Sequence, residues 1–154
     1  MGSKEDALLD YPATDESGDL GLLPAMPIEV TQLQQLSPNA LAYLGDAVYE
    51  LYIRNYYLYP PKRSQTYHRL VVAQVKAETQ ALHLLSLIPH LNKGELEVVR
   101  RGRNAAIGKP RRAEPEIYQQ ATSLETLIGY LHLTDRKRLL QLLKELKLES
   151  HLGE

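Results

Sequence analysis

Apolar residues recur every three or four positions through most of the chain after Pro27, which is the spacing of one face of an α-helix. The first such stripe consists of Leu41, Leu44, Val48, Leu51 and Tyr52. The sequence shows neither the two-residue alternation of a half-buried strand nor a hairpin signal. The pattern therefore predicts an all-α fold of five to seven helices.

Caps and prolines mark the expected ends of these helices. Ser37 followed by Pro38 predicts a helix start, and the helix should stop before Pro60. Ser64 is expected to cap a second helix that continues to Pro89. Further helices are predicted from Glu95 to about Arg101, from Pro115 through Glu125, and from Thr134 or Asp135 through Leu146, with residues 102–113 as a loop.

The chain of 154 residues suits a single folded domain, which we place at residues 28–150. Residues 1–27 are acidic and lack periodicity, so we expect a flexible tail there. The sequence contains no cysteine, no apolar run of about 20 residues and no secretory signal. These features favour a cytoplasmic protein without disulfide bonds, thiolate metal sites or a membrane span.

Two carboxylates stand beside glycines inside apolar helical stretches. Asp46 follows Gly45, and Glu125 precedes Gly129 by one helical turn. Glycine inside a helix costs about 1 kcal/mol relative to alanine, so each glycine should allow something to approach closely. We expect the two helices to pack through these glycines and to bring Asp46 and Glu125 together.

Two carboxylates at close range repel each other unless one is protonated or both share a cation. Oxygen ligands of this kind suit Mg²⁺, with Mn²⁺ as an alternative. The sequence therefore predicts a metal site at Asp46 and Glu125, although each residue could also be a surface carboxylate. Glu50, one turn after Asp46, could support the site or form a surface ion pair.

Basic residues are concentrated before the Glu125 helix. Residues 1–30 carry a net charge of −6 and the remainder carries +5, although the whole chain has a net charge of −1. The segment of residues 100–112, before the Glu125 helix, contains six cations: Arg100, Arg101, Arg103, Lys109, Arg111 and Arg112. Such a segment can hold phosphates or can be a solvated basic loop. Lys76 is a further candidate for a phosphate contact, with an ordinary surface position as the alternative.

These residues carry a resemblance to a known family. The stretch from Leu41 to Glu50 resembles the signature helix of the ribonuclease III catalytic domain, and Leu124 to Leu133 resembles its second acidic helix. The segment Arg100-Arg101-Gly102-Arg103-Asn104-Ala105 resembles the Mini-III branch, which consists of the catalytic domain alone. The resemblance implies no appended double-stranded-RNA-binding domain. It also adds Asn104 to the RNA-binding candidates Arg100, Arg101, Arg103, Lys109 and Lys76.

The resemblance implies a homodimeric endoribonuclease that hydrolyses double-stranded RNA and leaves 5'-phosphates, with Asp46 and Glu125 as its catalytic residues. It further implies a role in maturing large-subunit (23S) ribosomal RNA, with help from a large-subunit ribosomal protein. Two positions depart from full-length ribonuclease III, where carboxylates stand in place of Ala42 and Thr122. These departures leave the number of metal ions open. They also motivate an alternative, a non-catalytic RNA-binding or ribosome-associated protein, while a helical protein-interaction module would leave the arginines unexplained.

Overall fold

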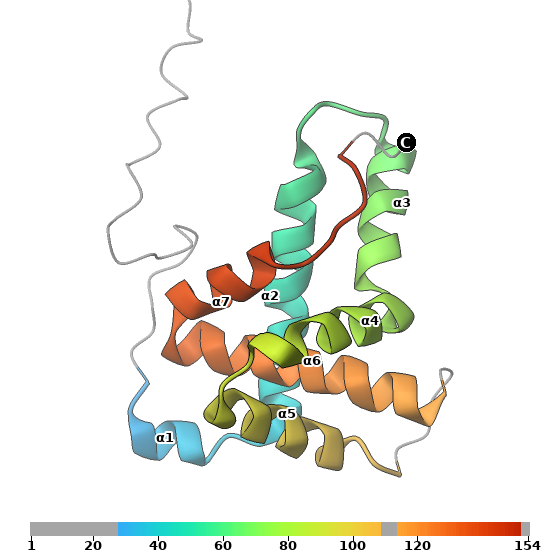
Figure 1. Ribbon diagram of the computed structural model, residues 1–154. Helices are drawn as coiled ribbons and strands as arrows, with labels where there is room; N and C mark the ends of the chain where they lie inside the picture. Colours follow the sequence, from blue (N-terminus) through green and yellow to red (C-terminus); the bar gives the residue numbers. More distant parts are fainter. Residues whose placement is uncertain (1–27, 109–113, 152–154) are drawn as a thin grey trace, which may run out of the picture.

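The computed structural model describes residues 28–108 and 114–151, and these ranges contain seven α-helices, one short 3-10 helix and no strand (Figure 1). The elements are α1 (Val30–Gln34), α2 (Pro38–Leu58), α3 (Ser64–Val75), α4 (Ala77–Leu87), η2 (Ile88–His90), α5 (Lys93–Ala105), α6 (Pro115–Thr134) and α7 (Arg136–Lys144). The predicted all-α fold is confirmed. The expected tail at residues 1–27 lies outside the described residues.

Helix α6 is the centre of the domain. It contacts α2, α4, α5 and α7, and Figure 1 shows α2 crossing it while α5 runs alongside. From Ala121 to Leu131 nearly every residue of α6 is buried. A helix buried on all sides organises the core, and here it also carries Glu125. None of the helices in the described residues combines the length and the apolar character needed to cross a bilayer.

The predicted helix starts at residues 37 and 135 are confirmed. The Ser37 side chain accepts a hydrogen bond from the Ala40 N–H at 3.1 Å, and the Asp135 side chain accepts one from the Arg138 N–H at 3.0 Å. Ser64 differs from the prediction, because it is the first helical residue of α3 and the cap residue Arg63 makes no side-chain capping bond.

The buried face of α2 differs from the predicted stripe. Its buried positions include Gly45, Tyr49, Ile53 and Tyr57, spaced four residues apart, whereas Leu51 is 41% exposed. The two tyrosines can be buried because both hydroxyls donate hydrogen bonds. Tyr49 donates to the Gln74 backbone carbonyl at 2.9 Å, and Tyr57 donates to a backbone carbonyl close to the C-terminus. Contact through glycine, which hydropathy does not reveal, rotates α2 away from the leucine-rich face.

The predicted second helix is two helices. Lys76 has an extended backbone, with ψ at 152°, and separates α3 from α4. Side chains satisfy the carbonyls released at this break: Thr79 Oγ1 donates to the Ala73 carbonyl at 2.6 Å and Gln80 Nε2 donates to the Val75 carbonyl at 2.8 Å. No glycine or proline marks the position, so the sequence pattern gave no signal for it.

The predicted loop at residues 102–113 begins later than expected. Helix α5 continues through Gly102 to Ala105, and residues 109–113 lie outside the described part of the chain. Gly102 is buried against α6, where a Cβ atom would lie 2.5 Å from Thr126 Oγ1. Gly102 therefore serves helix packing, which outweighs its low intrinsic helix propensity.

Candidate active site

Two glycines allow α2 and α6 to cross in backbone contact. A Cβ atom added to Gly45 would lie 1.8 Å from the Glu125 carbonyl oxygen, and one added to Gly129 would lie 2.0 Å from the Leu41 carbonyl oxygen. Neither position has room for any side chain. The crossing therefore fixes Asp46, the neighbour of Gly45, against the turn of α6 that carries Glu125, as the sequence predicted.

A cleft of about 320 Å³ lies at this crossing. Its lining residues are Asn39, Ala42, Tyr43, Asp46, Tyr118, Thr122 and Glu125. Asp46 is exposed, whereas Glu125 is half-buried. The two predicted catalytic carboxylates thus share one cavity.

The Glu125 carboxyl group has an unusually weak acidity. Burial raises its pKa to about 8, and the charge of Asp46 and a hydrogen bond with Asp46 contribute in the same direction. Its charge also adds to the effects that raise the pKa of the buried Tyr49 hydroxyl. Near neutral pH the pair therefore retains a proton unless a cation supplies the compensating charge.

The cleft suits a hard divalent cation. Its charged donors are carboxylate oxygens, and oxygen ligands are preferred by Mg²⁺ and Mn²⁺. Within residues 28–108 and 114–151, no group of three or more His, Cys, Asp or Glu side chains is placed to share a metal ion. Among the described residues that line the cleft, Asp46 and Glu125 are the two that carry negative charge.

The two positions that lack carboxylates also line this cleft. Ala42 lies one turn before Asp46 on α2, and Thr122 lies one turn before Glu125 on α6. Both are almost fully buried, at 7% and 5% exposure. They face the same space as the carboxylate pair but bring no charge to it.

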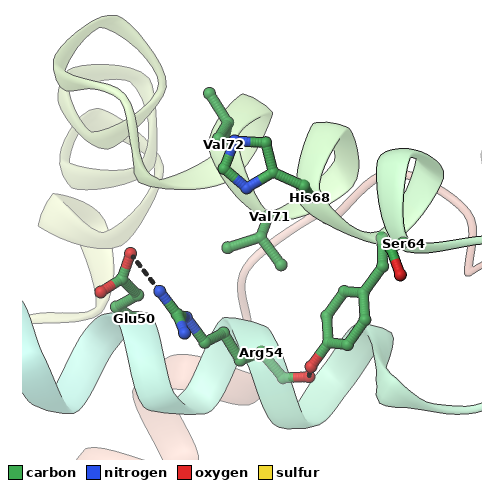
Figure 2. Close-up of a pocket in the computed structure, with 7 residues that line it drawn as sticks. Glu50, Arg54, Ser64, His68, Val71 and Val72 are labelled. Atoms are coloured by element: carbon green, nitrogen blue, oxygen red, sulfur yellow. Dashed lines mark hydrogen bonds and ion pairs between the residues drawn. The ribbon is translucent and has the colours of Figure 1, made fainter.

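Glu50 belongs to a different cleft. Figure 2 shows its carboxylate paired with the Arg54 guanidinium on the next turn of α2, at 3.5 Å. This second cleft has a volume of about 250 Å³ and lies between α2 and α3, with His68 and Val71 on the opposite wall. Of the two interpretations of Glu50, the ion pair is the one that the structure supports.

The candidate RNA-binding residues that the structure describes lie on α5 and at the start of α4. Arg100, Arg101, Arg103 and Asn104 are exposed on α5, where Arg100 is paired with Glu97 through an Nε–Oε2 hydrogen bond of 2.9 Å. Arg101 and Arg103 flank Gly102, which packs on α6 against Ser123 and Thr126, close in sequence to Glu125. Lys76 is exposed at the start of α4, and Lys109 lies outside the described residues.

Three cleft residues were not predicted to belong to the site. Asn39 and Tyr43 precede Asp46 by seven and three residues on α2, and Tyr118 precedes Glu125 by seven on α6. These spacings place each residue on the same helix face as a carboxylate. Helical spacing from Asp46 and Glu125 was therefore the signal that could have identified them.

Comparisons with known proteins define the class to which this fold and site belong. A family model described as "Ribonuclease III domain" matches residues 39–136, a range that contains both carboxylates and both glycines of the helix crossing. The chain belongs to the ribonuclease III family. Members of this family cleave double-stranded RNA, and the chain is an endoribonuclease of this class.

The relatives narrow the assignment to one branch of the family. The chain is 57% identical over 122 residues to Mini-ribonuclease 3 of Synechocystis sp., covering 79% of this chain and 85% of that protein. It is 52% identical over 134 residues to Mini-ribonuclease 3 of Synechococcus sp., covering 87% and 93%. A crystal structure of a protein from Fusobacterium nucleatum matches with a TM-score of 0.63 and 33% identity, over 71% of this chain and 93% of that one. The resemblance to Mini-III sequences is confirmed.

Proposed function

We propose that the cleft between α2 and α6 is the catalytic centre of a divalent-metal-dependent endoribonuclease, with Asp46 and Glu125 as its catalytic and metal-binding residues. The observation that carries this proposal is the backbone contact at Gly45 and Gly129, which brings two carboxylates into one cleft. The raised pKa of Glu125 supports it, because this arrangement of charge is costly without a cation. Mg²⁺ is the proposed ion, with Mn²⁺ as an alternative.

A divalent cation bound in the cleft would lower the pKa of a bound water molecule. It would also compensate the negative charge on the phosphate and on the leaving oxygen. Asp46 and Glu125 would hold this cation at the helix crossing. The backbone contact between α2 and α6 holds the two turns that carry the carboxylates together before substrate arrives, which reduces the reorganisation needed during the reaction. The products expected from this chemistry carry 5'-phosphate and 3'-hydroxyl ends.

The basic face of α5 is proposed to position the RNA backbone. Arg101 and Arg103 are exposed on either side of the glycine that packs α5 onto the helix carrying Glu125. We assign supporting contacts to Arg100, Asn104, Lys76 and Lys109. Duplex RNA hides its base edges in a deep and narrow major groove, so contacts should go to phosphates and 2'-hydroxyls.

A homodimer is proposed because one cleft cuts one strand. The outer face of α2 leaves large apolar side chains in solvent, with Leu51 at 41% exposure and Leu58 at 61%. An apolar helix face of this extent suits contact with a second copy of the same helix around a two-fold axis. The duplex has a matching pseudo-two-fold symmetry, so two clefts could act on opposite strands.

The proposed substrate in the cell is the precursor of large-subunit (23S) ribosomal RNA, processed in the cytoplasm with a large-subunit ribosomal protein as a partner. The assay that tests the catalytic proposal incubates a long RNA duplex with the protein and Mg²⁺, with and without a chelator. We expect chelator-sensitive cleavage of the duplex and none of the equivalent single strand. Binding without cleavage would instead favour the ribosome-associated alternative that the neutral residues at positions 42 and 122 suggest.

A further inference from the structure

We propose that each cleft holds a single divalent cation, and that Ala42 and Thr122 are the residues that set this number. The inference rests on the proposed metal-dependent function and specifies it further. It concerns the number of cations bound in each cleft of the RNA-free protein, because bound RNA would add phosphate charges of its own.

Charge balance in the cleft is the first argument. Among its seven lining residues, only Asp46 and Glu125 are carboxylates, and none is a histidine, lysine or arginine. One divalent ion is neutralised by this pair. Two ions would leave two uncompensated positive charges in a half-buried site, which is unfavourable in a medium of reduced dielectric.

The geometry of the walls is the second argument. In two-metal sites the ions lie about 3.5–4 Å apart and need anionic ligands between and around them. The positions that could supply such ligands are one turn before each carboxylate, and these are Ala42 and Thr122. The Ala42 methyl group offers no lone pair, and the Thr122 hydroxyl is a neutral ligand. Neither residue therefore supplies the negative charge that a second ion needs.

Two other acids of the surrounding helices are engaged elsewhere, which is the third argument. Glu50 is paired with Arg54 at 3.5 Å and lines the cleft between α2 and α3 (Figure 2). Glu95 is buried and accepts two hydrogen bonds from the Arg138 guanidinium, at 2.8 and 3.0 Å. Among the described residues, no third acid lines the catalytic cleft.

The test is a titration of the full chain with Mn²⁺ and without RNA, followed by electron paramagnetic resonance. Bound Mn²⁺ is counted from the loss of the free-ion signal, and two ions in one cleft would add a spin-coupled spectrum. The expected result is one ion per protomer without coupling, and none for Asp46→Asn. Glu50→Gln is the matched control, because it removes an acid one turn from Asp46 that lines the other cleft, and it should leave one ion bound.

The outcomes separate the two proposals. Two coupled ions per protomer in the unmodified protein would overturn the single-ion inference while leaving the metal-dependent function intact. No ion bound in the cleft would overturn the proposed metal site itself. Thr122→Asp, close to threonine in size, and Thr122→Asp combined with Ala42→Glu should raise the count toward two. A folded variant of this kind that still binds one ion would show that these residues do not set the number.

Discussion

Gly45 and Gly129 face each other across the crossing of α2 and α6: a Cβ atom on Gly45 would lie 2.8 Å from the Gly129 nitrogen, and one on Gly129 would lie 3.2 Å from the Gly45 nitrogen. The two glycines therefore act as one contact, in which each helix lies against the backbone of the other. Since Asp46 and Glu125 belong to the same two turns, helix packing and active-site geometry depend on the same pair of residues.

Alanine at either glycine should separate the helices. We expect Gly45→Ala and Gly129→Ala each to lower the free energy of unfolding by about 1–3 kcal/mol, the range for overpacked cores, and to reduce cleavage strongly. Gly94→Ala on α5 is the control, because a Cβ atom there would meet nothing closer than the Asn92 side-chain oxygen at 3.5 Å. The measurements are urea unfolding and duplex cleavage; equal effects at positions 45 and 94 would contradict the packing argument.

Removing one charge from the carboxylate pair should abolish catalysis while the fold persists. Asp46→Asn and Glu125→Gln keep the size of each side chain but remove a ligand charge, so we expect the cleavage rate with Mg²⁺ to fall by orders of magnitude. Circular dichroism and light scattering should be unchanged. Near-normal activity in either variant would mean that this residue has been assigned wrongly.

Glu125 should also make the metal-free protein less stable as pH rises. Its pKa is raised from 4.5 to about 8 in the folded chain, so between these values the folded state binds more protons than the unfolded state. Stability in a chelator should therefore fall as pH increases through this window. Thermal unfolding should show that Glu125→Gln flattens this dependence and is the more stable protein at the alkaline end.

The same proton should be displaced when a cation binds. We expect Mg²⁺ or Mn²⁺ affinity to rise with pH up to about 8 and to level off above it, because the cation competes with the proton on Glu125. Calorimetric titrations in buffers of different ionisation enthalpy measure the released protons directly. An affinity independent of pH across this range would place the cation away from Glu125.

The α5 arginines should contribute to RNA binding without recognising the base sequence. In an Asp46→Asn background that prevents cleavage, Arg101→Ala and Arg103→Ala should each weaken the binding of RNA duplexes of unrelated sequence by similar factors. Each lost phosphate contact should flatten the slope of log affinity against log salt by about one unit. Arg100→Ala is the internal comparison and should have a smaller effect, because Arg100 is already paired with Glu97. Unchanged affinity in an Arg101→Ala, Arg103→Ala double variant would indicate a solvated basic surface.

A charge on the outer face of α2 should dissociate the proposed dimer. Leu51→Glu and Leu58→Glu each place a carboxylate on this exposed apolar face, where burial against a second copy would be costly. Analytical ultracentrifugation should show monomers for these variants and a dimer for the unmodified chain. Leu82→Glu on α4 is the control, since Leu82 is 66% exposed but lies on another helix. An unmodified protein that is monomeric and still cuts both strands of the RNA duplex would contradict the proposed dimer.

The sequence by itself determined the helical fold, the helix starts at Ser37 and Asp135, and the placement of two carboxylates beside helix glycines. Periodicity reports local geometry, and caps such as Ser37 act within one turn, so both can be recognised without knowing the rest of the structure. The glycines beside Asp46 and Glu125 were informative for the same reason. An unfavourable residue in a regular helix predicts a close contact, although it does not say with what.

The tertiary structure alone decided which faces are buried and where helices break or continue. Tyr49 and Tyr57 are in the core because distant carbonyls accept their hydroxyls, and Gly102 remains helical because α6 packs against it. The break at Lys76 depends on two side chains that satisfy freed carbonyls. The assignment of Glu50 to a separate cleft depends likewise on Arg54 and on α3. Each of these outcomes is set by groups that come together only on folding, so the order of residues along the chain could not reveal them.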